Sequence, residues 1–218
     1  MFELSDNLDI KKEVFCKTII YTIDNFYKYP DEILKYLFEK PAPLHKDYDD
    51  PSYNNILFED RRYNFYDSRL VPVIDFLSNL ISQKPESYEI VTNQARFYNH
   101  TFNDYKNCYW WPHVDGGYNG IVYFNKNENE CGTNLYSEIT ESELIYDDIN
   151  EHYAPWRQKE NYKMIKSLPP KYNRLVLFDG YKFPHGMNIV NNHYFSDEYR
   201  INQVFFFDDP NFVDDCFA

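Results

Sequence analysis

Within residues 1–87, one β-branched run is followed by two segments whose apolar residues have helical spacing. Residues 17–24 (KTIIYTID) are β-branched and bounded by polar residues, which predicts a short strand. Residues 30–40 begin with a proline and two acids and then present one apolar stripe, which predicts a helix. This helix is expected to end before Pro41, because proline does not continue a helix.

A second helix is predicted by apolar residues spaced three and four apart over 70–81. Asp67 or Ser68 can cap it, and Pro72 falls in the first turn, where no intrahelical donor is lost. Both apolar stripes are expected to pack against a sheet. The polar stretch before this helix, 41–68, is expected to be an ordered loop.

From residue 88 onward the pattern changes to short apolar or alternating runs. These runs predict strands at 88–99, 120–124, 132–137, 173–179, 186–190 and 200–207. The charged stretch 138–170 contains three prolines and is expected to be a partly helical insertion. Helices first and strands afterwards predict a single α+β domain, a sandwich or barrel braced by helices. Its core would be 88–208, with 1–87 as a supporting N-terminal region.

Composition and charge limit the classes of partner. A net charge of −13 argues against nucleic acid, because a binding face must neutralise phosphates with clustered Lys and Arg. The N-terminus lacks the pattern of a signal peptide, and no stretch approaches the roughly 20 apolar residues that span a bilayer. Four scattered cysteines are typical of free thiols. We therefore expect a soluble, cytoplasmic protein without a membrane partner. Its many Asn, Lys, Tyr, Phe and Ile are typical of an AT-rich genome, such as that of a phage or virus.

Three residues could form a metal site. His113 and Asp115 stand two positions apart, so on an extended strand both side chains point to the same face. His185 directly follows the predicted strand 173–179 and could complete the set. Two imidazoles and one carboxylate form the facial triad of non-haem Fe(II) oxygenases, which leaves three coordination positions open. The same donors also suit Mn or Zn.

Arg200 begins a strongly apolar strand. A guanidinium in such a strand needs a partner, because an unpaired buried charge is costly. A dicarboxylate such as 2-oxoglutarate would supply one, gripped by the fork-shaped guanidinium. The alternative is a structural salt bridge to Asp179 or Asp197.

The order H-x-D, distal histidine and then arginine resembles the 2-oxoglutarate/Fe(II)-dependent oxygenase superfamily, including its prolyl-hydroxylase-like members, over roughly 88–208. The resemblance implies a double-stranded β-helix, a jelly-roll or cupin-like core with supporting helices. It also implies that His113, Asp115 and His185 hold Fe(II), that Arg200 anchors 2-oxoglutarate, and that O₂ is the other co-substrate.

Smaller matches imply helpers for the co-substrate. IVYFN is similar to the Y-L-N strand of prolyl hydroxylases, whose tyrosine contacts 2-oxoglutarate, and this makes Tyr123 a candidate. Arg-Ile-Asn at 200–202 resembles the R-x-N of the demethylating branch, although that branch's later second arginine is absent. Asn202 is therefore a second candidate. Tyr98 is a third, and Tyr105 competes for its role.

Two further likenesses bear on the chemistry. The runs PHVDG, GTNLY and NRLVLF are similar to an uncharacterised group of presumed oxygenases often encoded beside tryptophan halogenases. Iron halogenases of the superfamily replace the carboxylate with a small residue to make room for chloride. Asp115 is present, which favours hydroxylation.

Three functions remain open. The first is a dioxygenase that hydroxylates a C–H bond of an amino acid, peptide side chain or small metabolite, with succinate and CO₂ as co-products. The second is a non-catalytic jelly-roll module that binds or senses a metal or ligand. The third is nucleic-acid hydroxylation or demethylation, which R-x-N suggests and the net charge opposes. Specificity is expected to lie in 41–68 and 138–170.

Overall fold

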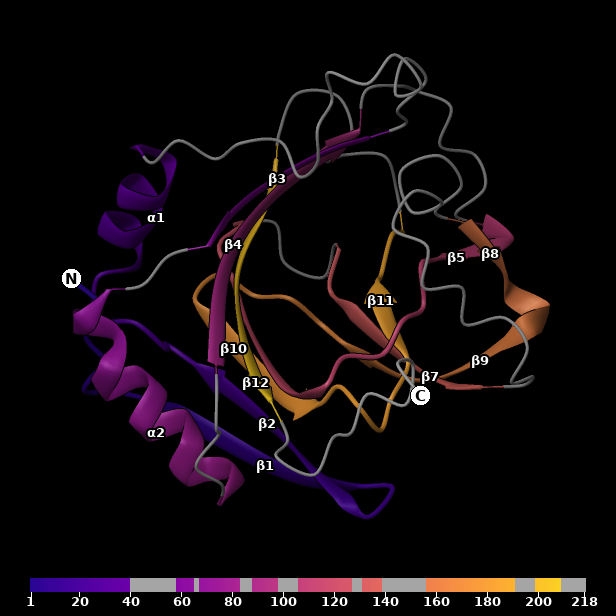
Figure 1. Cartoon of the computed structure of the whole chain (residues 1–218), viewed down its shortest axis with the longest axis horizontal. Helices are drawn as coiled ribbons and strands as arrows, with labels where there is room; N and C mark the ends of the chain where they lie inside the picture. The colour runs from indigo at the N-terminus through magenta and orange to yellow at the C-terminus, as the bar shows by residue number, and fades with distance from the viewer. Residues whose placement is uncertain are drawn as a thin grey trace, which may run out of the picture.

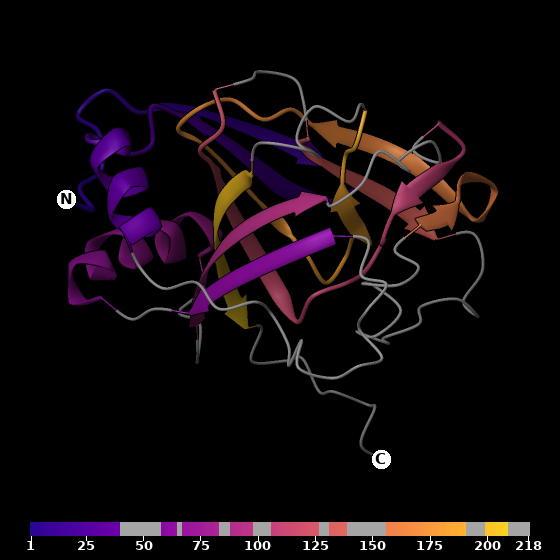
Figure 2. The ribbon, with the colours of Figure 1, turned by 90° about the horizontal axis from the view of Figure 1, so that it is seen from above.

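The computed structural model describes residues 1–39, 58–64, 67–82, 88–97, 106–126, 131–138, 156–190 and 199–208. Its helices and strands are, in chain order, β1 (Asp9–Phe15), β2 (Thr18–Asp24), α1 (Pro30–Glu39), β3 (Phe58–Asn64), α2 (Val71–Ile81), β4 (Tyr88–Phe97), β5 (Cys108–Trp110), β6 (Gly117–Tyr123), β7 (Thr133–Glu138), β8 (Trp156–Gln158), β9 (Tyr162–Leu168), β10 (Arg174–Asp179), β11 (His185–Met187) and β12 (Arg200–Asp208). Figure 1 shows a large sheet with α1 and α2 outside it and a smaller sheet on its other side, and Figure 2 shows these layers from above. Among the described residues, no helix is long and apolar enough to cross a membrane.

The described strands form two antiparallel sheets that face each other and a separate two-stranded sheet, β5-β8. The larger has the order β1-β2-β10-β6-β12-β4-β3, and the smaller has the order β11-β7-β9. Strand β5 pairs with β8, and a bridge between His113 and His185 joins the segment after β5 to β11. Strands β10-β6-β12-β4 thus face β9-β7-β11 and the β5 segment, which is the arrangement of a jelly roll. The predicted fold class is confirmed.

Strand alternation divides the apolar residues into two layers. On β10, Leu175 and Leu177 pack in the cluster that includes the helices, whereas Val176 and Phe178 pack between the sheets. The helices contribute to the outer cluster the buried residues Ile33, Leu37, Val73, Ile74 and Leu77. Toward one end of the inner face the apolar layer gives way to polar side chains, and these line the cavity described below.

Both predicted helices and every predicted strand are present, with ends shifted by a few residues. The expectation of a loop over 41–68 is wrong for 58–64, which forms the edge strand β3 paired along β4. Its sequence, FEDRRYN, has no apolar alternation, because one of its faces borders the polar cavity. Residues 40–57 lie outside the described part.

The expectation of a partly helical insertion over 138–170 is wrong for 156–170. This segment forms β8 and β9, and its single helical turn is the 3₁₀ turn Lys159–Asn161. The exposed positions of strand β9 are Lys163, Met164 and Ser167, and the segment is a strand because it pairs with β7. Residues 139–155 are not described. Strand β1, mostly exposed, was not predicted.

Asp24 at the end of β2 ties this strand to the start of β10. The carboxylate accepts hydrogen bonds from Arg174 Nε at 2.6 Å and Nη2 at 3.0 Å, and from Lys171 Nζ at 3.3 Å. The hydrogen bond from Arg174 holds the pKa of Asp24 below its usual range. Because breaking a buried ion pair is costly, Asp24→Asn is expected to lower the free energy of unfolding at pH 7 by about 3 kcal/mol.

The effect of Asp24→Asn should depend on pH. A carboxyl group whose pKa is lower in the folded state stabilises the fold when it is ionised. Its contribution is complete above the unfolded pKa of 3.8 and is lost as the pH falls through the lower folded value. Urea unfolding of both proteins at pH 7 and at acidic pH should show the gap between them shrinking below about pH 4. A gap of the same size at all pH values would contradict this role.

Candidate metal centre and cofactor cavity

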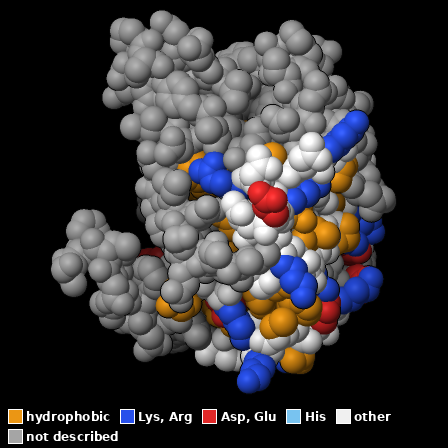
Figure 3. Space-filling view, turned by 90° about the vertical axis from the view of Figure 1, so that its right-hand side faces the viewer, with side chains coloured by type: hydrophobic (Ala, Val, Ile, Leu, Met, Phe, Trp, Pro, Cys, Tyr) orange, Lys and Arg blue, Asp and Glu red, His pale blue; other side chains and the backbone are white. Residues whose placement is uncertain are grey.

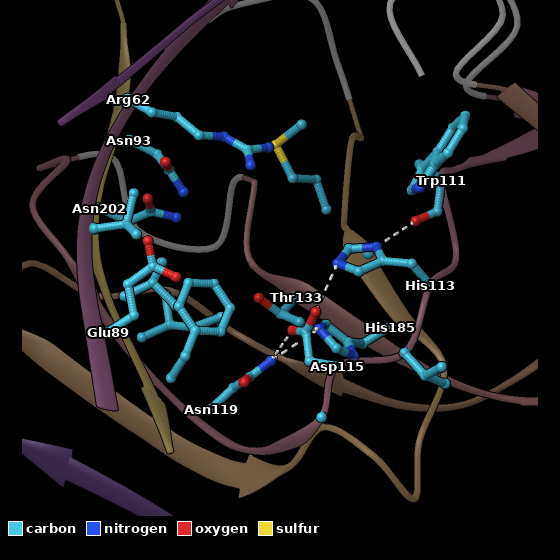
Figure 4. A pocket seen from close by; sticks show the side chains of 18 of the residues that line it. Arg62, Glu89, Asn93, Trp111, His113, Asp115, Asn119, Thr133, His185 and Asn202 are labelled. Carbon is cyan, nitrogen blue, oxygen red and sulfur yellow. Dashed lines mark hydrogen bonds and ion pairs between the residues drawn. The ribbon is translucent and has the colours of Figure 1, made fainter. Parts of the chain in front are cut away.

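Backbone pairing holds His113 and His185 side by side. The amide of His113 donates to the carbonyl of His185 at 3.0 Å, and the amide of His185 donates back at 2.7 Å. Asp115 is fixed by its own amide, which donates to the carbonyl of Gly180 at 3.1 Å. One ligand atom from each of His113, Asp115 and His185 lies within 4.8 Å of the others. The three residues predicted as ligands therefore meet at one point (Figure 4).

Backbone carbonyls orient both imidazoles. Nδ1 of His113 lies 2.8 Å from the carbonyl oxygen of Trp111, and Nδ1 of His185 lies 3.0 Å from that of Phe183. A carbonyl oxygen only accepts, so each Nδ1 carries a proton, and Nε2 of each ring is the nitrogen that faces the cluster and could bind a metal. Nε2 of His185 lies 3.0 Å from Oδ2 of Asp115, and Nε2 of His113 lies 4.0 Å from Oδ1. Histidines that bind metals are commonly held in this way.

The pKa shifts of His113 and Asp115 favour the protonation states that bind a metal cation. Burial lowers the pKa of His113, and the charges of His185 and Arg62 lower it further, against an opposing effect of Asp115. Burial alone would raise the pKa of Asp115. The charge and hydrogen bond of His185, with the effects of His113 and Asn119, outweigh burial and hold this pKa below its usual range. A neutral imidazole and an ionised carboxylate are the forms that coordinate metals.

Asn119 on β6 supports the carboxylate of the cluster. Its buried Nδ2 donates to Oδ2 of Asp115 and lies 3.1 Å from Nε2 of His185. Asn119 was not among the predicted site residues, because YNG is typical of a turn and the predicted strand began at Gly120. The alternation of Asn119, Ile121 and Tyr123 on the inner face was the signal that could have revealed it.

Gly186 lets the two histidine-bearing segments approach each other. A Cβ atom at this position would lie 2.1 Å from the carbonyl oxygen of Trp110 and 3.0 Å from that of Trp111. On the opposite segment, Trp111 has a φ of 33°, a left-handed value that bulky residues rarely adopt. Close backbone approach is thus the reason for a glycine beside His185.

Gly186→Ala is expected to push the segments of His113 and His185 apart. We expect a loss of about 2 kcal/mol in the free energy of unfolding, typical of overpacking, together with weaker metal binding. The matched control is Gly120→Ala on β6, where the new Cβ would meet its nearest neighbour, Cβ of Phe205, at an ordinary 3.5 Å. Urea unfolding and anaerobic Fe(II) titration of both variants provide the test. Equal behaviour of the two variants would show that the close approach is not required.

A cavity of about 640 Å³ lies beside the cluster. This volume falls within the roughly 300–1,000 Å³ typical of small-molecule sites. Figure 4 shows His113, Asp115 and His185 on one side of the cavity and residues of the larger sheet on the other. The latter include Arg62 of β3, Asn93 of β4 and Asn202 of β12.

Arg200 lines the same cavity and is 8% exposed. Its Nε donates to the carbonyl of Cys131 at 2.9 Å, and its guanidinium lies 5.9 Å from the centre of the Tyr123 ring. Within the described ranges, no ion pair joins Arg200 to a carboxylate, Asp179 included. Asp197, the other proposed partner, lies outside those ranges. The surroundings of this buried cation therefore suit a carboxylate from a ligand.

The predicted helpers have different positions. Asn202 lines the cavity and is buried. Tyr123 contacts Arg200 through its ring, and its hydroxyl bonds Oγ1 of Thr133 at 2.8 Å. Its position suits orienting the arginine. Tyr98 and Tyr105 lie outside the described residues.

Several polar cavity residues of the larger sheet were not predicted as site residues. Arg62 stands in β3, within the segment expected to be a loop, and Glu89 and Asn93 stand on β4. On β4 the cavity-facing positions are Glu89, Val91, Asn93 and Ala95, a mixture of polar and apolar residues that gives no periodic signal.

Comparisons with known proteins give distant structural likenesses. No family model matches the chain, and no curated protein matches it. Among solved structures, an oxidoreductase of the 2OG-Fe(II) oxygenase family from Burkholderia pseudomallei matches with 9% identity, over 84% of this chain and 79% of that one, with a TM-score of 0.46. A prolyl-4-hydroxylase from Pseudomonas putida matches with 10% identity, over 82% of each chain, with a TM-score of 0.39. The Fe(II)/α-ketoglutarate-dependent dioxygenase TqaL matches with 10% identity, over 84% and 75%, with a TM-score of 0.43.

Proposed function

We propose that this chain is an Fe(II)- and 2-oxoglutarate-dependent dioxygenase that hydroxylates a C–H bond of a small molecule or peptide side chain. One observation carries the proposal. A single cavity holds a cluster of two histidines and one carboxylate together with a buried arginine that has no carboxylate partner among the described residues. The cluster alone would also suit Mn or Zn, and the arginine is what favours the iron and 2-oxoglutarate pair.

The residues fit these two groups. His113 and His185 would bind the iron through Nε2 and Asp115 through a carboxylate oxygen, which leaves three coordination positions for other ligands. Arg200 would bind the distal carboxylate of 2-oxoglutarate through paired N–H donors. Asn119 would hold the Asp115 carboxylate in place, and the ring of Tyr123 would support the guanidinium.

When bound, iron and 2-oxoglutarate supply the oxidation, in which O₂ and 2-oxoglutarate give succinate and CO₂ and one oxygen atom enters a substrate C–H bond. The protein supplies positioning and a sheltered space. Residues of both sheets line the cavity, and backbone carbonyls orient both imidazoles. Because the side chains are already oriented, they need not reorganise during the reaction, and this lowers the activation free energy.

The charge of the chain favours a small-molecule or peptide substrate over nucleic acid. The net charge is −13. In Figure 3, on the face that carries β5, β8 and β9, Lys and Arg side chains lie apart, with hydrophobic, polar and acidic groups between them. A stripe of clustered basic residues, which a phosphate backbone requires, is not seen in the described part of this face.

The test is an aerobic assay with Fe(II) and 2-oxoglutarate. We expect the full chain to form succinate as 2-oxoglutarate is consumed, slowly without substrate and faster with it. His113→Ala should reduce succinate formation to the level without protein. If iron and 2-oxoglutarate bind but no succinate forms in the presence of any stimulant, the chain is a binding or sensor module instead.

A further inference from the structure

A second arginine lines the cavity on the wall opposite the cluster. In the larger sheet, Arg62 of β3 lies two strands from β12, which carries Arg200. Figure 4 shows the Arg62 guanidinium directed into the cavity, toward the side of His113. Arg200 matches the distal carboxylate of 2-oxoglutarate, and Arg62 is a second guanidinium in the lining of the same cavity.

Hydrogen-bond donors flank Arg62. Arg62 is the register partner of Asn93, and Asn93 is the register partner of Asn202, so the three side chains stand in a row across β3, β4 and β12. The amide oxygens of Asn93 and Asn202 are buried. Figure 4 shows the amide nitrogens of both turned toward the cavity. A guanidinium beside two amide N–H₂ groups offers only donors, which is complementary to an oxyanion.

Charge in the cavity distinguishes between oxyanions. Glu89 and Asp208 also line it, and Glu89 accepts a hydrogen bond from Nδ2 of Asn64. A carboxylate would bring a single negative charge to the donors of the Arg62 guanidinium. A phosphate carries −1.5 to −2 near pH 7 and would add uncompensated charge near these acids. The row therefore suits a carboxylate better than a phosphate.

We propose that the substrate is a small free carboxylic acid, such as a free amino acid, whose carboxylate is bound by Arg62 and Asn93 while its reacting carbon faces the cluster. Asn202 lies between this carboxylate site and Arg200. The volume of about 640 Å³ accommodates such an acid together with the co-substrate. This inference rests on the proposed dioxygenase function and narrows its substrate class.

The test compares acids with their amides. The full chain, with Fe(II), 2-oxoglutarate and O₂, is assayed for succinate with each standard amino acid, its deaminated carboxylic acid and its carboxamide. We expect at least one free acid to stimulate succinate formation, and its amide to be at least about tenfold weaker in kcat/KM, because the amide lacks the charge that Arg62 binds. Arg62→Gln should raise the KM for that acid at least about tenfold.

Arg61→Gln is the matched control. Arg61 is the adjacent residue of β3, pairs with Gln94 and does not line the cavity, so its variant should respond to the acid as the original protein does. The proposal is wrong if amides stimulate as well as acids, if no acid stimulates, or if Arg62→Gln keeps its KM. Anaerobic addition of 2-oxoglutarate to the Fe(II) protein distinguishes failure of the proposed dioxygenase function from failure of the proposed substrate class. Without a visible absorption band from the iron and 2-oxoglutarate complex, the dioxygenase proposal itself fails. With the band present, those outcomes refute only the substrate class.

Discussion

Asp115→Ala is expected to weaken Fe(II) binding at least about 100-fold and to reduce succinate formation to background. Asp115 is the only carboxylate in the described cluster, and both Nε2 atoms lie close to its oxygens. Loss of a group that merely orients a ligand already costs 10–100-fold in metal affinity, so loss of a ligand should cost at least the upper value. Anaerobic calorimetric titration with Fe(II) measures the effect.

Asp208→Ala is the control for Asp115→Ala. Asp208 also lines the cavity, but it is exposed at the end of β12, and its removal changes the net charge by the same amount. Its Fe(II) affinity should stay within about threefold of the original, as expected for an exposed charge. Thermal unfolding of the metal-free proteins checks that both variants fold. If a folded Asp115→Ala protein binds Fe(II) as tightly as Asp208→Ala does, the metal centre lies elsewhere.

Arg200→Gln is expected to weaken 2-oxoglutarate binding at least about 30-fold while leaving Fe(II) binding in place. A lost charge-assisted hydrogen bond costs about 2 kcal/mol, which corresponds to this factor. Arg200→Lys keeps the charge but not the two-pronged geometry, so an intermediate loss is expected. Equilibrium binding of 2-oxoglutarate to the Fe(II) protein without O₂ provides the measurement.

Arg62→Gln is the informative comparison for Arg200→Gln, because both arginines line one cavity. Arg200 is buried against a backbone carbonyl and an aromatic ring, whereas Arg62 is half-buried. We expect Arg62→Gln to keep its affinity for 2-oxoglutarate. The opposite pattern, with loss in Arg62→Gln alone, would exchange the roles of the two arginines.

The fold could be predicted from the sequence in those elements where burial of one face imposes a regular spacing of apolar residues. The apolar stripe of α2 and the apolar runs of β6, β10 and β12 face packed layers, so their residues carry a clear pattern. Strands β3 and β9 could not be predicted in this way. Each is a strand because it pairs with β4 or β7, and neither buries a continuous apolar face.

The candidate site could be predicted in part for a similar reason. His113, Asp115 and His185 were identified because few residue types coordinate metals and their order is distinctive. Asn119 and Arg62 are common residue types, and their importance depends on register across strands that are distant in sequence. The need for Gly186 depends on a backbone approach between two segments that no local pattern reveals.

The most direct test of the central claim is an anaerobic spectrum. Fe(II) and then 2-oxoglutarate are added to the metal-free protein, and the visible region is recorded for the weak charge-transfer band of a chelated complex. The account predicts that the band appears in the original protein, is absent in His185→Ala and, at limiting 2-oxoglutarate, is strongly reduced in Arg200→Gln. Iron binding without any band, at 2-oxoglutarate concentrations up to the millimolar range, would contradict it.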